Sequence, residues 1–170
     1  MTTPTPASYG DAKETAPLDP QSFDLAAWIE GVNPVRHAVT IYQRGDLVAD
    51  LDVVKARLNN AKLAKNSKEI AALTKQARGI VEIIEQSSLD VVVEGWSEDR
   101  VKAFREPLKE QGLSDEEVTV RQVAAQVVSP EGFTAEFYQT LLGVIRPQAE
   151  AIAAAAFAAN VRVPVVSVPS

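Results

Sequence analysis

The stretch VRHAVTIYQRGDLVADL (residues 35–51) changes its hydrophobic period halfway along, and this change decides the fold class. In its first half, β-favouring residues alternate between two faces, which predicts a strand. One face carries Val35, His37, Val39 and Ile41. From Asp46 onward the apolar residues recur every three or four positions, which predicts an amphipathic helix. The helical stripe consists of Leu47, Leu51, Val54 and Leu58.

The turn between these two elements contains Arg44, Gly45 and Asp46, the tripeptide that extracellular adhesion proteins present to integrin receptors. Local structure explains the tripeptide without a receptor. Gly45 allows the chain to turn from strand to helix, and Asp46 is expected to cap the helix by accepting hydrogen bonds from its free amides. We therefore do not expect an adhesive role.

A second helix and a second strand follow. The polar connection NNAKLAKNSKE (59–69) contains Ser67, a suitable cap for a helix whose apolar residues again recur at helical spacing. That stripe consists of Ile70, Leu73, Ala77, Ile80 and Ile84. The stretch SLDVVVEGW (88–96) alternates like a strand and places Leu89, Val91 and Val93 on one face. Two strands separated by a helical hairpin can pair in a small sheet, and the sequence leaves the strand direction open.

From Ser97 onward the signals are helical. Ser97 is expected to cap a helix that Pro107 kinks or shortens and that Gly112 ends. The stretch SDEE (114–117) has the pattern of a capping box and opens a further helix over VTVRQVAAQVV (118–128). The β-branched residues of that stretch leave a strand as the alternative.

Two more helices are expected, one after Thr134 and one from Pro147. The apolar side of the first consists of Phe137, Leu141 and Val144 or Ile145. The expected fold is mainly α (α+β): a helical domain with a small two-stranded β element, a helical hairpin between the strands and a C-terminal helical bundle.

Domain boundaries follow from composition. Residues 1–22 contain four prolines and only Tyr9 and Leu18 as large apolar groups, so we expect a disordered tail that cannot offset the entropy of ordering. Residues 164–170 are expected to form an extended tail because two prolines forbid a helix there. A chain of 170 residues is long enough for one core, so residues 23–163 are expected to form a single, mostly helical domain.

The composition offers little for catalysis. The chain has no cysteine and one histidine, His37, whose place on the apolar strand face indicates a structural role. Asp46, Asp50 and Asp52 have no second group of ligands beside them, and helix capping explains their cluster. No glycine-rich phosphate loop or nucleophile motif occurs in the sequence. We therefore expect no enzyme, no catalytic residue, no cofactor and no metal site.

Charge and hydropathy restrict the partners. The net charge of −6 disfavours a dedicated nucleic-acid binder, and no apolar run reaches the roughly 20 residues that span a membrane. The first residues lack the pattern of a secretion signal, so we expect a soluble protein that is not secreted. One basic patch crosses the expected hairpin tip and consists of Lys55, Arg57, Lys62, Lys65 and Lys68. This patch is either a solvated loop that complements a helix end, or a contact for an acidic partner or nucleic acid.

The stretch AIAAAAFAAN (151–160) predicts a helix that neighbouring elements can approach closely, because alanine favours helix and adds little bulk. Such a helix either packs tightly within the domain or offers a smooth surface to an amphipathic helix of another protein. Five residues are candidate partner contacts: Leu141, Val144, Ile145, Ile152 and Phe157. Each of these residues could instead belong to the core.

Two parts of the chain, HAVTIYQRGDLVADLDVVKARLNNA (37–61) and the segment 118–160, resemble the tail assembly chaperones of long-tailed (siphovirus-type) actinobacterial phages. The resemblance covers roughly residues 23–163. It rests on an aromatic-containing strand that leads into DLVADL and on a pattern V-x-P-E-G-x-T, here Val128 to Thr134. A glutamine, Gln148, and an alanine-rich helix that ends in Asn160 complete the likeness.

The resemblance implies a factor that works in the host cytoplasm and is absent from the mature virion. Such chaperones bind the long, helical, apolar tape measure protein and keep it soluble until tail-tube subunits polymerise around it. It also implies a possible contact with the tail-tube protein, self-association and a longer form made by ribosomal frameshifting. The alternative is a structural virion protein, such as a head-tail connector or a capsid accessory protein.

Overall fold

The computed structural model describes residues 24–164, which belong to two units divided between Asn33 and Pro34. The described part of the first unit contains α1 (Leu25–Glu30), a short helix whose first amides are capped by Asp24. The division falls inside the stretch 23–163 that was expected to form one domain. The tail expected at 1–22, and all of the tail expected at 164–170 except Pro164, lie outside the described residues.

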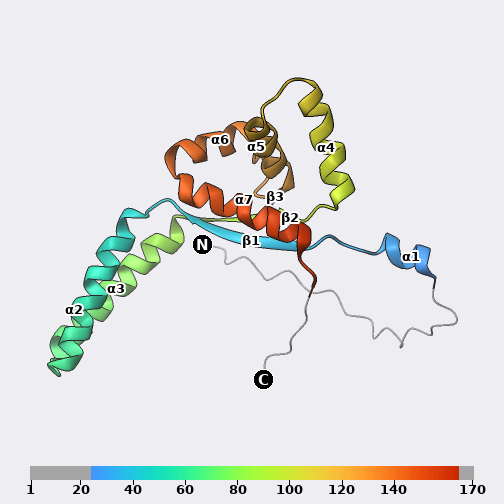
Figure 1. Ribbon diagram of the computed structural model, residues 1–170. Coiled ribbons are helices and arrows are strands. Elements are labelled where there is room, and N and C mark those ends of the chain that lie inside the picture. The colour runs from blue at the N-terminus through green and yellow to red at the C-terminus, as the bar shows by residue number, and fades with distance from the viewer. Residues whose placement is uncertain (1–23, 165–170) are drawn as a thin grey trace. The chain divides into compact units, whose positions relative to one another are not determined.

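A three-stranded antiparallel sheet organises the second unit (Figure 1). The strands are β1 (Arg36–Tyr42), β2 (Ser88–Glu94) and β3 (Val127–Ser129), in the order β1-β2-β3. Both long strands were predicted, and their direction, which the sequence left open, is antiparallel. The expected two-stranded element was wrong because β3 was missed. Three residues directly after a helix are too few to show a strand period, and their β-branched side chains continue the pattern of that helix.

A helical hairpin connects β1 to β2, as predicted. It consists of α2 (Asp46–Leu63) and α3 (Ser67–Gln86), which pack side by side (Figure 1). The buried residues between them are Val54, Ala61 and Leu73, and Leu58, Ile70, Ala77 and Ile80 pack against these. The predicted stripes therefore face each other.

Two predicted caps of this hairpin were wrong. Asp46 is the first residue of α2, and its carboxylate accepts hydrogen bonds from Nε of Arg44 at 2.9 Å and from Nη2 at 2.8 Å. Such a bidentate, charge-assisted pair competes well against a capping bond, and it holds the pKa of Asp46 below its usual range. Gly45 has a helical φ of −61°, so the turn does not require a glycine. At α3, Asn66 rather than Ser67 is the cap and accepts from the Glu69 amide at 3.2 Å.

Three of the remaining helices begin where the sequence predicts, and the last begins at Arg146, one residue before the predicted Pro147. They are α4 (Glu98–Glu110), α5 (Asp115–Gln126), α6 (Ala135–Val144) and α7 (Arg146–Val161). Ser97 and Thr134 cap α4 and α6, and Ser114 forms the expected capping box with Glu117. The helix α4 continues through Pro107, and Gly112 follows it with a φ of +83°, a backbone conformation that glycine adopts easily.

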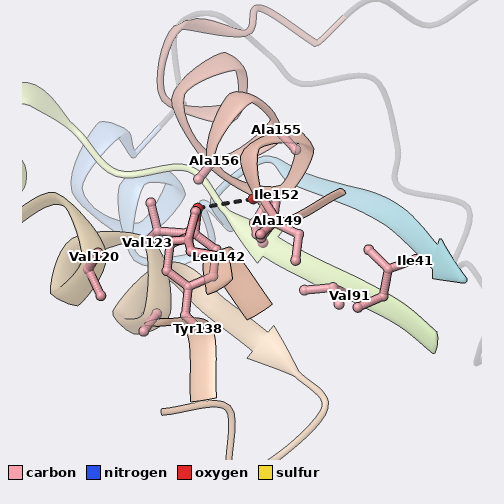
Figure 2. Packing of buried hydrophobic residues seen from close by; sticks show 12 residues of the cluster. Ile41, Val91, Val120, Val123, Tyr138, Leu142, Ala149, Ile152, Ala155 and Ala156 are labelled. Atoms are coloured by element: carbon pink, nitrogen blue, oxygen red, sulfur yellow. Dashed lines mark hydrogen bonds between the residues drawn. The ribbon is translucent and has the colours of Figure 1, made fainter. Parts of the chain in front are cut away.

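The main core lies between α7, α5, α6 and the strands (Figure 2). We call these helices and strands, together with α4, the body. Val91 and Val93 of β2 and Val123 of α5 are fully buried, as are Ile152 and Ala156 of α7. The alanine-rich helix therefore packs inward, which the sequence had left open. Its small side chains let it approach the sheet so closely that a Cβ on Gly95 would lie 2.3 Å from the carbonyl oxygen of Ala159.

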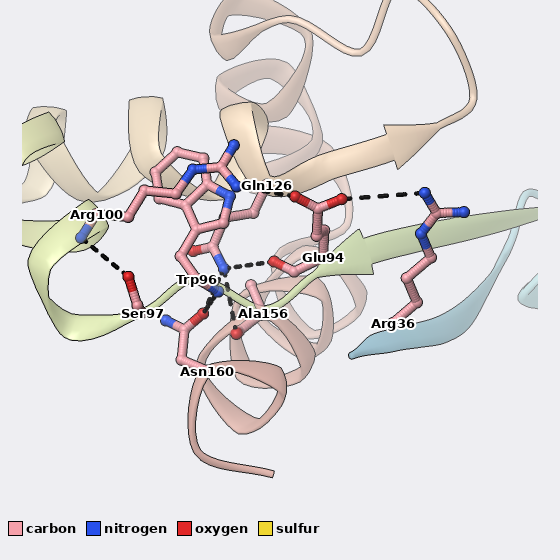
Figure 3. A network of polar contacts seen from close by, with 8 residues as sticks. All are labelled: Arg36, Glu94, Trp96, Ser97, Arg100, Gln126, Ala156 and Asn160. Atoms are coloured by element: carbon pink, nitrogen blue, oxygen red, sulfur yellow. Dashed lines mark hydrogen bonds and ion pairs between the residues drawn. The ribbon is translucent and has the colours of Figure 1, made fainter. Parts of the chain in front are cut away.

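A buried polar network joins α7 to the end of β2 (Figure 3). The Asn160 carboxamide oxygen accepts from the backbone amide of Trp96 and from Nε2 of Gln126, both at 2.7 Å. Nε2 of Gln126 also donates to the Glu94 carbonyl at 2.9 Å. Because Gln126 is fully buried, each of these bonds satisfies a group that would otherwise be costly. The network fixes the angle between α7 and the sheet.

Candidate functional site

An open, apolar pocket of about 420 Å³ lies where β1 and β2 meet α6. From α6 and the turn after it, the pocket receives Phe137, Thr140, Leu141, Val144 and Ile145. From the strands and their ends it receives Ile41, Tyr42, Gln43, Ser87 and Leu89. We call this the α6 pocket. Its volume falls in the lower part of the range for ligand-binding clefts, roughly 300 to 1,000 Å³.

The helix α6 forms one wall of the pocket because it carries apolar residues on two sides. Tyr138 and Leu142 are buried in the core, with exposed fractions of 2% and 8%. Phe137 and Val144 face the pocket and keep exposed fractions of 41% and 76%. The expected apolar stripe of this helix was therefore only partly right, because Tyr138 and Leu142 form the side that packs inward. The other side, with Phe137 and Val144, lines the open pocket.

Gln148 of α7 holds the end of β1, which forms the opposite wall. Its side-chain oxygen accepts from the Tyr42 amide at 2.6 Å, and its side-chain nitrogen donates to the Tyr42 carbonyl at 3.1 Å. Because β1 is an edge strand, the carboxamide of Gln148 takes the place that a neighbouring strand would occupy. It thereby ties the pocket wall to the helix that crosses the core.

Two further hollows adjoin Tyr42. One, of about 420 Å³, lies between β1, the start of α2 and the start of α7, and includes Val48 and Ala151. The other, of about 330 Å³, lies against the hairpin and includes Leu51 and Ile84. Tyr42 lines all three spaces, with 39% of its surface exposed. An apolar surface thus continues from α6 around Tyr42 to the base of the hairpin.

The structure separates the five candidate partner contacts. Leu141, Val144 and Ile145 come together in the α6 pocket. Ile152 is fully buried in the core, so its assignment as a surface contact is corrected. Phe157 is 42% exposed on α7 and is not among the residues that line the pocket.

Ile152 was misassigned because alanines surround it on every side of the helix, and the sequence could not show which side faces the sheet. Reasoning from sequence also missed Tyr42 and Leu89 as parts of the site. Tyr42 lies on the polar face of the strand pattern, and Leu89 was assigned to the strand's apolar face without a partner role. The sequence signal for Tyr42 was a large aromatic residue at the end of a predicted strand.

The candidate groups for chemistry lie apart from this pocket. The ring nitrogen Nδ1 of His37 lies 3.1 Å from Nη1 of Arg162, near the end of α7. Within residues 24–164, no group of three or more His, Asp or Glu side chains is placed to hold a metal ion. The same residues include no helix long and apolar enough to cross a membrane. The polar groups that line the α6 pocket are hydroxyls and an amide, so the arrangement is suited to binding apolar side chains.

Comparison of the chain with protein-family models, with curated proteins and with solved structures found no match.

Proposed function

We propose that this protein is a tail assembly chaperone of a long-tailed actinobacterial phage, and that it binds apolar helical segments of the tape measure protein in the host cytoplasm. The observation that carries the proposal is the α6 pocket. Three residues that the sequence marks as candidate contacts, Leu141, Val144 and Ile145, lie together on its wall. The sequence resemblance supplies the identity of the client, and the pocket supplies a surface for it.

The chemistry of the surface supports a helical client. An amphipathic helix presents apolar side chains at intervals of three and four residues to an apolar groove. The α6 pocket and the two hollows beside Tyr42 offer several neighbouring places for such side chains. Because few polar groups line the α6 pocket, it imposes little directional selection, which suits a chaperone that must accept many segments of one long client.

The test is co-expression of the protein with the candidate tape measure protein. Wild-type protein should raise the soluble fraction of the client several-fold and should co-purify with it. Val144→Asp should lose most of this effect, because it places a charge at the mouth of the apolar pocket. Val144 is 76% exposed, so the change should leave the fold intact, which circular dichroism and thermal unfolding would check.

Val161→Asp is the matched control. Val161 is the last residue of α7 as Val144 is the last residue of α6, and it is 81% exposed. This variant should protect the client as well as wild type does. Equal loss in both variants, or no loss in Val144→Asp, would remove the α6 pocket from the proposal. A wild-type protein that neither solubilises nor retains the client would end the proposal itself.

A further inference from the structure

The charges of the helical hairpin are segregated along its length. Residues 55–78, which we call the tip half, contain seven basic residues and one acidic residue. Residues 46–54 and 79–86, the root half, contain five acidic residues and no basic residue. The tip half therefore has a net charge of +6 and the root half a net charge of −5, in a protein whose total is −6.

The charges of the tip half are not neutralised by nearby groups. All seven basic side chains are exposed, and within residues 24–164 none forms an ion pair. In the root half, Asp46 pairs with Arg44, which precedes the hairpin. Asp50, Asp52, Glu82 and Glu85 have no ion pair in the same part of the chain. Elsewhere in the second unit some acids and bases pair closely, as in Arg100 with Glu94 at 3.0 Å and Lys109 with Asp115 at 2.9 Å.

Within one hairpin, the basic tip half and the acidic root half lie too far apart to neutralise each other. The change of sign falls between Asp52 and Lys55 on α2 and between Arg78 and Glu82 on α3, at similar heights, because Val54 and Ala77 belong to the same packed cluster. Asp50 and Asn59, the middles of the two α2 segments, are nine positions apart, which is about 14 Å along a helix. That separation exceeds the screening length of about 8 Å at physiological salt.

We propose that the helical hairpin binds the hairpin of a second copy of this chain in an inverted orientation, so that each tip half lies against the other root half. Such an arrangement has two-fold symmetry and brings the +6 and −5 surfaces together twice. The helix α2 has 18 residues and is about 27 Å long, so both contacts fit side by side in one interface between two hairpins. This inference goes beyond the chaperone proposal and does not depend on it, since it uses no residue of α6.

The charge pattern favours a second copy over nucleic acid. A duplex laid along the hairpin would place its phosphates against the acidic root half as well as the basic tip half. The tip half also contains no aromatic residue on which bases could stack. Because exposed ion pairs are individually weak, the association should be modest in strength and strongly dependent on salt.

Sedimentation velocity of the full chain at low salt and at about 1 M salt, where the screening length falls to about 3 Å, tests the proposal. Wild type should form dimers at low salt and return to monomers at high salt. A tip variant, Lys62→Glu with Lys68→Glu and Lys75→Glu, should stay monomeric at low salt. A root variant, Asp50→Lys with Glu82→Lys and Glu85→Lys, should also stay monomeric.

Mixing the tip and root variants in equal amounts should restore dimer formation in part, because the unchanged root half of the tip variant (−5) then meets the unchanged tip half of the root variant (+6), a contact that neither variant can form with itself. The control for net charge is a body variant, Glu110→Lys with Glu116→Lys and Glu131→Lys, which changes total charge as the root variant does. It should dimerise as wild type does, which would show that the loss in the root variant comes from the position of the changed charges and not from the total charge. Circular dichroism should show unchanged helicity in all four proteins.

Three results would overturn the inference. The first is a monomeric wild type at low salt and high protein concentration. The second is a dimer that both the tip and root variants retain. The third is a monomer that binds duplex DNA in a salt-dependent way through the tip half, because the basic surface would then have a different occupant.

Discussion

The helical hairpin and the body of the second unit are stabilised in different ways. The body buries twelve residues in one cluster and adds polar bonds between α7, α5 and β2, whereas the hairpin buries three residues between two helices. Some charges of the body pair across neighbouring elements, such as Lys109 of α4 with Asp115 of α5, while the hairpin separates its charges by sign. The body is therefore the part that resists change. The hairpin is the part whose surface can change at small cost in stability.

The largest expected effect compares two glycines. In Gly95→Ala the new Cβ would meet the Ala159 carbonyl oxygen at 2.3 Å, so α7 must move, and the free energy of unfolding should fall by about 3 kcal/mol. In Gly79→Ala, inside α3, the Cβ meets nothing within 4 Å, and better helix propensity should add about 0.5–1 kcal/mol. Urea unfolding followed by circular dichroism measures both. A tolerated Gly95→Ala would mean that α7 is packed less rigidly than described.

A smaller difference is expected between two asparagines. Asn160→Ala removes the acceptor of the Trp96 amide and one of the acceptors of Gln126 Nε2 in the body, and should cost about 2 kcal/mol of unfolding free energy. Asn66→Ala removes an exposed cap of α3 and should cost about 1 kcal/mol. The same urea titrations compare the two variants. If Asn66→Ala proved the more costly, the hairpin would contribute more to global stability than its small core implies.

The smallest effect is an alkaline one and belongs to the body alone. Burial, and to a lesser degree the charge of Glu150, raises the pKa of Tyr138 to about 12. Because this folded value lies above the ordinary value of 10.0, Tyr138 contributes stability that is complete below pH 10 and is lost as the pH rises toward 12. The hairpin contains no tyrosine, so it makes no such contribution to stability.

Tyr138→Phe should flatten this alkaline decline, and it should lower stability near neutral pH by about 1 kcal/mol through loss of the hydrogen bond to the Ala149 carbonyl. Unfolding curves across the alkaline range, with phenolate absorbance as the titration signal, provide the measurement. A Tyr138 that titrates with the ordinary value would show that its hydroxyl is open to water.

Patterns of several residues predicted the elements well. Alternation over seven residues identified β1 and β2, and stripes at helical spacing identified both helices of the hairpin and the sides on which they meet. The capping signals at Ser97, Ser114 and Thr134 were confirmed because each has one dominant local partner. The cap at Asp46 failed because Arg44, two residues away, offered a stronger partner.

What escaped prediction depends on tertiary contact. Three-residue β3 exists because β2 lies beside it, and no period in its own sequence could reveal it. An alanine-rich helix has no distinctive side, so the burial of Ile152 follows from the sheet and not from the helix. The sequence predicted only part of the α6 pocket. It indicated Leu141 and Val144 as contacts, but it did not indicate Tyr42, which lines the same pocket from the strand end that Gln148 holds.

The ladder between β1 and β2 has a consequence for how this chain can be rebuilt. Tyr42 and Ser88 are paired neighbours, and the amide of Gln43 still donates to the carbonyl of Ser87 at 3.3 Å. The chain therefore leaves the sheet at the end of β1 and returns to it at the start of β2, where the two strands are directly paired. The hairpin thus occupies the place where a β-turn would normally connect two antiparallel strands. A short loop there would allow the same pairing of β1 with β2. We therefore expect the body to keep its fold when the hairpin is exchanged, lengthened or replaced by a short loop.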